Sequence, residues 1–367
     1  MNAEFPYLLY YLGLFITVIS VSRFIFRSYI KFAKFYNLTN STNLRLANKV
    51  NVITGGGVVF AAVLMLAALV LENLDFVEFS NFSPVLATSI LIAVVGFYND
   101  FIKISPFSMF IILIFLILML LYSNATLPII KNLNGFLGVN NIGFIAGLIF
   151  TSFIYIFIMT AINLSDGIDG YLAIFSIVFF ISLLYNFDIN QFYTLNSVSV
   201  IIIASSLIYL RYNFSKTKKL FLGDAGSLFI GFWIATYLIT YVTSAPYSEL
   251  VQVYSMDIEN IPIIAISMIS IPVLDSLRAI MIRMVNKKSP FEADRNHLHH
   301  ILLETGMTHF RASLFLTVIN WFNCITIFLI EQNFNSKQLT MVYIVISLFW
   351  YIFFEYLNRK NLNSLKG

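Results

Sequence analysis

Long apolar stretches of about 17 to 25 residues follow one another along this chain, and they constrain its fold more than any other feature. A stretch of this length crosses the hydrocarbon core of a bilayer as an α-helix. A soluble domain keeps roughly a quarter of its residues charged, whereas here 11% of the 367 residues are charged and 59% are hydrophobic. The sequence therefore predicts an all-α polytopic membrane protein, folded as a single integral membrane domain over residues 1–367.

Eleven membrane spans are predicted from this pattern. They cover residues 6–26, 56–72, 83–98, 104–123, 142–162, 171–186, 193–212, 225–244, 260–282, 311–330 and 340–357. Pro272 interrupts the ninth span, and because proline lacks a backbone N–H we expect a kink there. The first stretch carries Glu4 in place of a basic region and shows no small-residue cleavage site, which favours a retained span over a signal peptide.

The basic residues indicate the orientation. Of the 22 Lys and Arg residues, only Lys131 and Lys337 fall on one side of the predicted membrane, and the others fall on or beside the opposite side. Because Lys and Arg are enriched in cytoplasmic loops, we expect the N-terminus outside and the C-terminus inside. For most individual lysines a role as a topology signal is sufficient.

Four polar strings interrupt the apolar sequence on the predicted cytoplasmic side. They are GFYND at 96–100, NLSDGIDG at 163–170, FLGDAGS at 221–227 and SPFEADRNHLHH at 289–300. Ionisable residues at membrane spans are costly to bury and mark functional sites by default. The pattern is typical of an enzyme embedded in a membrane.

Asn163, Asp166 and Asp169 are spaced by three, so on a helical turn they would lie roughly along one side. Gly167 and Gly170 would let a ligand approach the backbone. This suits a site for a metal ion or a sugar nucleotide. The alternative is a polar turn between two spans, but two Asp-Gly pairs in so short a loop favour a functional role.

Asp224 stands directly before a predicted span, where a helix N-terminus favours phosphate groups and a carboxylate suits Mg2+. An N-cap aspartate is an equally good interpretation of this position. Asp100 closes the third span, and its surroundings leave its role open. Asp275, three residues before Arg278, is interpreted as one half of a structural ion pair within the membrane.

His297, His299 and His300 follow Asp294 and Arg295 in the largest predicted cytoplasmic loop. Clustered histidines suggest zinc, but the chain has a single cysteine, which lies elsewhere in an apolar stretch. Imidazoles beside an arginine also suit an anionic diphosphate, and the basic residues of this loop favour the anion. A solvated basic loop against acidic lipid headgroups is the alternative.

Together, the four strings resemble the polyprenyl-phosphate N-acetylhexosamine-1-phosphate transferase family of the WecA/MraY type. The resemblance runs in the family's order from Gly55–Gly57 to His300. The segment from Pro272 to His300 is similar to the WecA-like branch and differs from the branch of peptidoglycan synthesis. The resemblance implies that undecaprenyl phosphate attacks the sugar-bearing phosphorus of a UDP-N-acetylhexosamine. The products would be UMP and undecaprenyl-diphosphate-sugar. The lipid-linked sugar would then initiate a cell-surface polysaccharide.

The resemblance also implies roles for single residues. Asp224 would be the ligand of Mg2+, for which Mn2+ is an alternative. Asp100, Asp166 and Asp169 would be catalytic, with Asp100 near the acceptor phosphate. The remaining expected site residues bind the nucleotide or the donor phosphates, and they are Asn163, Arg295, His297, His299 and His300.

The expected partners are the UDP-N-acetylhexosamine donor, the undecaprenyl phosphate acceptor and membrane lipid. A homodimer is also expected, and nucleic acid is not. The resemblance implies a multi-pass protein of the bacterial inner (cytoplasmic) membrane with its active site on the cytoplasmic face.

Asn99 departs from the family pattern, which usually has two adjacent aspartates at this place. Asparagine can act neither as a base nor as a phosphorylated nucleophile. We still expect activity, because a phosphate monoester with a second pKa of about 6 is mostly dianionic at neutral pH. A non-catalytic homologue that binds the lipid carrier is the alternative. A secondary transporter would place its charges near the midplane of the membrane, whereas here the acids gather at one face.

Overall fold

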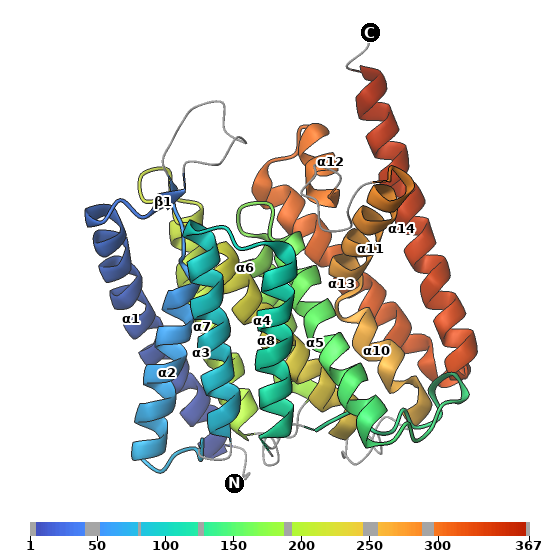
Figure 1. Cartoon of the computed structure of the whole chain (residues 1–367), viewed down its shortest axis with the longest axis horizontal. Helices are drawn as coiled ribbons and strands as arrows, with labels where there is room; N and C mark the ends of the chain where they lie inside the picture. The colour runs from blue at the N-terminus through green and yellow to red at the C-terminus, as the bar shows by residue number, and fades with distance from the viewer. Residues whose placement is uncertain are drawn as a thin grey trace. The chain divides into compact units, whose positions relative to one another are not determined.

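The computed structural model describes residues 5–40, 52–79, 82–123, 128–186, 193–244, 256–287 and 297–364. Within these ranges the regular elements are helices, apart from one antiparallel pair of short strands, β1 (Thr39–Asn40) and β2 (Val52–Ile53). Figure 1 shows these elements coloured along the chain. The predicted all-α class is confirmed.

Seven helices of the described ranges are long and apolar enough to cross a membrane. They are α1 (Phe5–Phe35), α3 (Ser83–Phe101), α5 (Phe144–Ser165), α7 (Tyr193–Asn213), α8 (Gly223–Ser244), α13 (His309–Ile330) and α14 (Ser336–Ser364). A bent pair, α10 (Ile261–Ser267) and α11 (Ser270–Val285), makes an eighth if it counts as one span. Three shorter apolar helices are α2 (Gly57–Asn73), α4 (Pro106–Tyr122) and α6 (Tyr171–Asn186). The chain is a polytopic membrane protein, while the count of eleven spans and their orientation stay predictions.

The expected kink at Pro272 is present. The segment that contains α10 meets the helix α11 at a bend of 69°. Pro272 has no N–H to donate to the carbonyl of Met268, and that carbonyl accepts a hydrogen bond from Asn320 Nδ2 of α13 at 2.8 Å instead. Asn320 Oδ1 accepts the N–H of Ile271 at 3.0 Å. One side chain of α13 therefore satisfies backbone groups on both sides of the break.

The chain divides into two compact units. The first contains residues 1–127 and 173–233, and the second contains residues 128–172 and 234–367. In the first unit α1 packs against α2 and α7, and α3 packs against α2 and α4 (Figure 1). In the second unit α5 packs against α11, while α13 packs against α10 and α11. The predicted single domain over the whole chain stays a prediction.

Glycines let the first turn of α8 pack closely against α2 and α3 in the first unit. A Cβ on Gly57 would collide with the main chain of Gly226, and a Cβ on Gly96 would lie 2.6 Å from the main-chain oxygen of Asp224. Gly56 donates its N–H to the carbonyl of Phe221 at 3.0 Å. These contacts bring the FLGDAGS string beside the GFYND string.

Candidate active site

Asp100 and Asp224 lie together in the first unit, although 124 residues separate them. Asp100 Oδ1 accepts the N–H of Asp224 at 2.8 Å, and Oδ2 accepts the N–H of Ala225 at 3.5 Å. These are two of the amides that the first turn of a helix leaves without an intrahelical partner. The buried carboxyl group of Asp100 thus caps α8 from another helix. The N-cap interpretation of Asp224 is therefore wrong, since Asp224 lies inside the first turn.

Asn99 completes this carboxylate cluster, which we define as Asn99, Asp100 and Asp224. Asn99 Oδ1 accepts the N–H of Ile104 at 2.7 Å, and its Nδ2 donates to Asp224 Oδ2 at 2.5 Å. Because the Ile104 N–H can only donate, the orientation of the Asn99 amide follows from its contacts. An aspartate at this position would retain the first contact but has no proton for the second when ionised. Asn99 therefore holds Asp224 through an uncharged donor.

The carboxylate cluster has the donor chemistry of a magnesium site in phosphoryl transfer. Mg2+ in such sites is held by one or two carboxylates together with substrate phosphates and water. Among the described residues, no group of three or more His, Cys, Asp and Glu side chains is placed to hold a metal ion. The carboxylates of Asp100 and Asp224 are hard oxygen donors of the kind that Mg2+ prefers, whereas a structural zinc site takes four Cys or His ligands.

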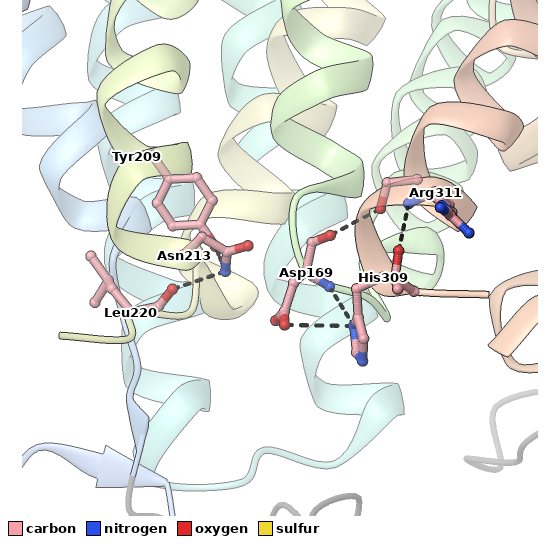
Figure 2. Close-up of polar contacts among 8 residues, drawn as sticks. Asp169, Tyr209, Asn213, Leu220, His309 and Arg311 are labelled. Carbon is pink, nitrogen blue, oxygen red and sulfur yellow. Dashed lines mark hydrogen bonds and ion pairs between the residues drawn. The ribbon is translucent and has the colours of Figure 1, made fainter. Parts of the chain in front are cut away.

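The polar segment before α8 is tied to α7 within the first unit. Asn213 Nδ2 of α7 donates to the carbonyl of Leu220 at 3.0 Å and to Tyr209 Oη at 2.8 Å (Figure 2). Asn213 is buried, so these bonds are shielded from water. They fix the segment that leads into the FLGDAGS string.

In the second unit, α5 ends at Ser165 and the loop 166–170 leads into α6. Asn163 lies in the last turn of α5, while Asp166 is the C-cap residue and donates its N–H to the carbonyl of Asn163 at 3.3 Å. Gly170, with a φ of 81°, ends the loop before α6. The prediction that the three polar residues share a helical face is wrong, because α5 ends at Ser165 and both Asp166 and Asp169 follow it.

His299 lies against this loop within the second unit. A Cβ on Gly167 would overlap the imidazole of His299, so the ring occupies the space that the glycine leaves. The His299 ring stacks on His297 with centroids 5.6 Å apart, and the centroid of the His300 ring is 4.3 Å away. The structure therefore brings the histidines and the Asp-Gly loop together. Arg295 lies outside the described residues.

His297 is held by two buried residues of α11. Its Nδ1 is 3.0 Å from Asp275 Oδ2, and its Nε2 is 3.3 Å from Arg283 Nη2. Arginine can only donate, so Nε2 accepts and Nδ1 carries the proton that Asp275 accepts. Asp275 Oδ1 also accepts the N–H of Leu298 at 2.8 Å. Asp275 thereby anchors the start of α12 (Leu298–Glu304).

The prediction of an ion pair between Asp275 and Arg278 is wrong. Arg278 donates to Glu355 Oε1 of α14 through Nε at 3.0 Å and through Nη2 at 2.5 Å. The spacing of three residues makes such a pair available along α11, but tertiary packing supplies each residue with a partner from another element.

Asp275→Asn is expected to lower the free energy of unfolding by about 1 to 3 kcal/mol. Asparagine keeps an acceptor for Leu298 but turns a donor toward the Nδ1 proton of His297. If the proton of the imidazole moves from Nδ1 to Nε2, Nδ1 can accept from the new amide, but the Nε2 proton then faces the N–H groups of Arg283. In either tautomer one buried donor has no acceptor. Thermal unfolding of the purified protein measures the effect. Unchanged stability would contradict this account of the buried contacts.

Asp169 contacts two residues of α13 that the sequence analysis does not single out. Its N–H donates to His309 Nδ1 at 3.2 Å, and its carbonyl accepts from Ser313 Oγ at 2.9 Å (Figure 2). Asp169 Oδ2 lies 3.5 Å from the same ring nitrogen. His309 is 140 residues away in the sequence, and no local pattern links it to Asp169.

A family of known proteins matches the middle of the chain. Residues 82–242 match the family described as "Glycosyl transferase family 4". This range contains the first three strings and ends before the histidines.

Three relatives carry related names. "Probable undecaprenyl-phosphate N-acetylglucosaminyl 1-phosphate transferase" of Bacillus subtilis (strain 168) is 30% identical over 150 residues, which are 41% of this chain and 38% of the relative. "Undecaprenyl-phosphate alpha-N-acetylglucosaminyl 1-phosphate transferase" of Haemophilus influenzae is 33% identical over 39% of this chain and 38% of the relative. The protein of the same name in Escherichia coli (strain K12) is 35% identical over 32% of this chain and 29% of the relative. The chain thus matches less than half the length of these relatives.

Proposed function

We propose that this chain belongs to glycosyl transferase family 4, which residues 82–242 match, and that it transfers N-acetylhexosamine 1-phosphate from a UDP-linked donor to undecaprenyl phosphate. The single observation that carries the proposal is the carboxylate cluster, in which Asp100 and Asp224 are held together at the first turn of α8. The names of the relatives favour N-acetylglucosamine as the sugar. The product would begin a cell-surface polysaccharide at the cytoplasmic face of a bacterial inner membrane.

In this reaction an oxygen of the acceptor phosphate forms a bond to the sugar-bearing phosphorus of the donor. The bond between that phosphorus and the bridging oxygen breaks, and its electron pair leaves on UMP. A bound Mg2+, or Mn2+, would neutralise charge on the diphosphate. Asp224 would hold the cation, and Asn99 keeps the Asp224 carboxylate in place. Asp100 fixes the first turn of α8 and would lie near the acceptor phosphate.

We assign the binding of the UDP-linked donor to residues of the second unit. Asn163, Asp166 and Asp169 would shape the nucleotide site, and the histidine string with Arg295 would bind the donor phosphates. The packing of His299 on Gly167 supports this assignment, because it couples the histidines to the Asp-Gly loop. His297 contributes mainly by holding α12, since both of its ring nitrogens contact buried residues of α11.

A non-catalytic homologue that binds the lipid carrier is the second candidate function. Asn99 is the observation that favours it, because the family usually has an aspartate there. The contact from Asn99 to Asp224 opposes it, since the substitution keeps the cluster assembled.

Direct assay separates the two candidates. The purified protein would be incubated in lipid nanodiscs with undecaprenyl phosphate, Mg2+ and a panel of UDP-N-acetylhexosamines, with UDP-glucose as the matched control. We expect release of UMP and a lipid product heavier by one N-acetylhexosamine phosphate, as measured by mass spectrometry. Acceptor binding without any lipid product from the whole panel would establish the non-catalytic alternative.

Asn99→Asp replaces the donor to Asp224 by a carboxylate, and a cation bound between the two carboxylates would offset their repulsion. We therefore expect the transfer rate to change by less than about tenfold, because the added group is otherwise only a nearby charge or a weak base. The rate at saturating substrates measures this, with Asp100→Ala assayed alongside because Asp100 is the neighbouring carboxyl group. A dead natural protein that Asn99→Asp rescues would contradict direct attack by the acceptor. A phospho-enzyme trapped with UDP-sugar in the absence of lipid acceptor would also contradict direct attack by the acceptor.

A further inference from the structure

We propose that His309 is a positioning residue for Asp169. Its imidazole accepts the main-chain N–H of Asp169 and thereby sets the direction in which the Asp169 carboxylate leaves the loop. The catalytic consequence rests on the proposed function, whereas the contact itself does not.

The start of α13 supplies a rigid base for this contact. Thr308 is the N-cap residue, and its Oγ1 accepts the N–H of Arg311 at 3.4 Å. His309 is the first residue of the helix, and Ser313 lies one turn later on the same side. The two side chains bond the N–H and the carbonyl of Asp169, so both of its main-chain polar groups are held by α13 (Figure 2).

The geometry also decides which nitrogen of His309 carries the proton. A main-chain N–H only donates, so Nδ1 must be the acceptor and the proton of the neutral ring lies on Nε2. The distance of 3.5 Å from Nδ1 to Asp169 Oδ2 is too long for a good hydrogen bond. His309 therefore acts on the main chain of Asp169 and not on its carboxylate.

Asp169 needs such support because its loop has no regular structure. The loop 166–170 lies between two helices and ends in a glycine of positive φ. The Asp169 side chain is 13% exposed and the His309 side chain is 47% exposed. A reacting group that is misplaced by about 1 Å loses much of its catalytic effect, so restraint of the main chain matters.

Three substitutions test the inference. His309→Ala removes the acceptor. His309→Asn offers its Oδ1 where Nδ1 stands, whereas His309→Gln is the matched control that carries its amide at the distance of Nε2. We expect about a tenfold lower kcat for Ala and Gln, and a kcat within about threefold of the natural protein for Asn, with the KM for undecaprenyl phosphate unchanged in all three.

Hydrogen exchange of the Asp169 amide gives a readout that does not depend on activity. This amide should exchange faster in the Ala and Gln variants and at its natural rate in the Asn variant, as measured by mass spectrometry with single-residue fragmentation. An unchanged exchange rate in His309→Ala would overturn the contact. Faster exchange with undiminished kcat would overturn the positioning role. A natural protein without transfer activity would overturn the proposed function, and the exchange rates would still decide whether His309 holds Asp169.

Discussion

Asp224→Ala is expected to reduce transfer at least about 1000-fold while the protein stays folded. The expectation follows from the carboxylate cluster, where Asp224 is the proposed cation ligand beside Asp100. Removing the carboxylate removes the negative charge that would hold the cation against the diphosphate. UMP release over a range of Mg2+ concentrations measures the loss, and thermal unfolding checks the fold.

Asp224→Asn separates charge from packing. Its Oδ1 still accepts from Asn99, so the cluster keeps its shape, but the negative charge is lost. We expect this variant to unfold at the same temperature as the natural protein and to be nearly as inactive as Asp224→Ala. Near-normal turnover of either variant would remove Asp224 from the metal site.

Gly57→Ala is expected to lower the free energy of unfolding by more than about 3 kcal/mol, beyond the usual range for overpacking. The added Cβ would lie 2.5 Å from the carbonyl carbon of Ala225 and would collide with the main chain of Gly226. Main-chain atoms of a helix cannot rotate away as a flexible side chain can. Either α2 or the first turn of α8 must therefore shift, and that turn carries Asp224.

Gly13→Ala is the matched control for this prediction. Gly13 lies in α1, and a Cβ there would meet no atom within 4 Å. Alanine is the better helix former, so this change should be neutral or stabilise by up to about 1 kcal/mol. Thermal unfolding of the two variants measures the difference. Equal unfolding temperatures would show that the close approach of α2 and α8 is not required.

The apolar helices and the bend before Pro272 were predictable, because they depend on neighbouring residues and on the solvent around them. A long apolar segment satisfies its backbone groups within its own helix in lipid, and proline removes a donor wherever it stands. The four polar strings were predictable as candidates for the same reason, since each places ionisable groups where burial is costly.

The sequence alone determined the class of the chain and the strings that are candidates for its chemistry, but only the tertiary structure decided which residues of those strings contact one another. Asn99 reaches Asp224 across 125 residues, and Asp169 reaches His309 across 140. Asp275 contacts His297 although Arg278 is nearer in the sequence. Within one helix, a side chain can pair only with residues three or four positions away. The packing of several helices places further partners beside it, and the distances and angles of those contacts decide which hydrogen bonds form.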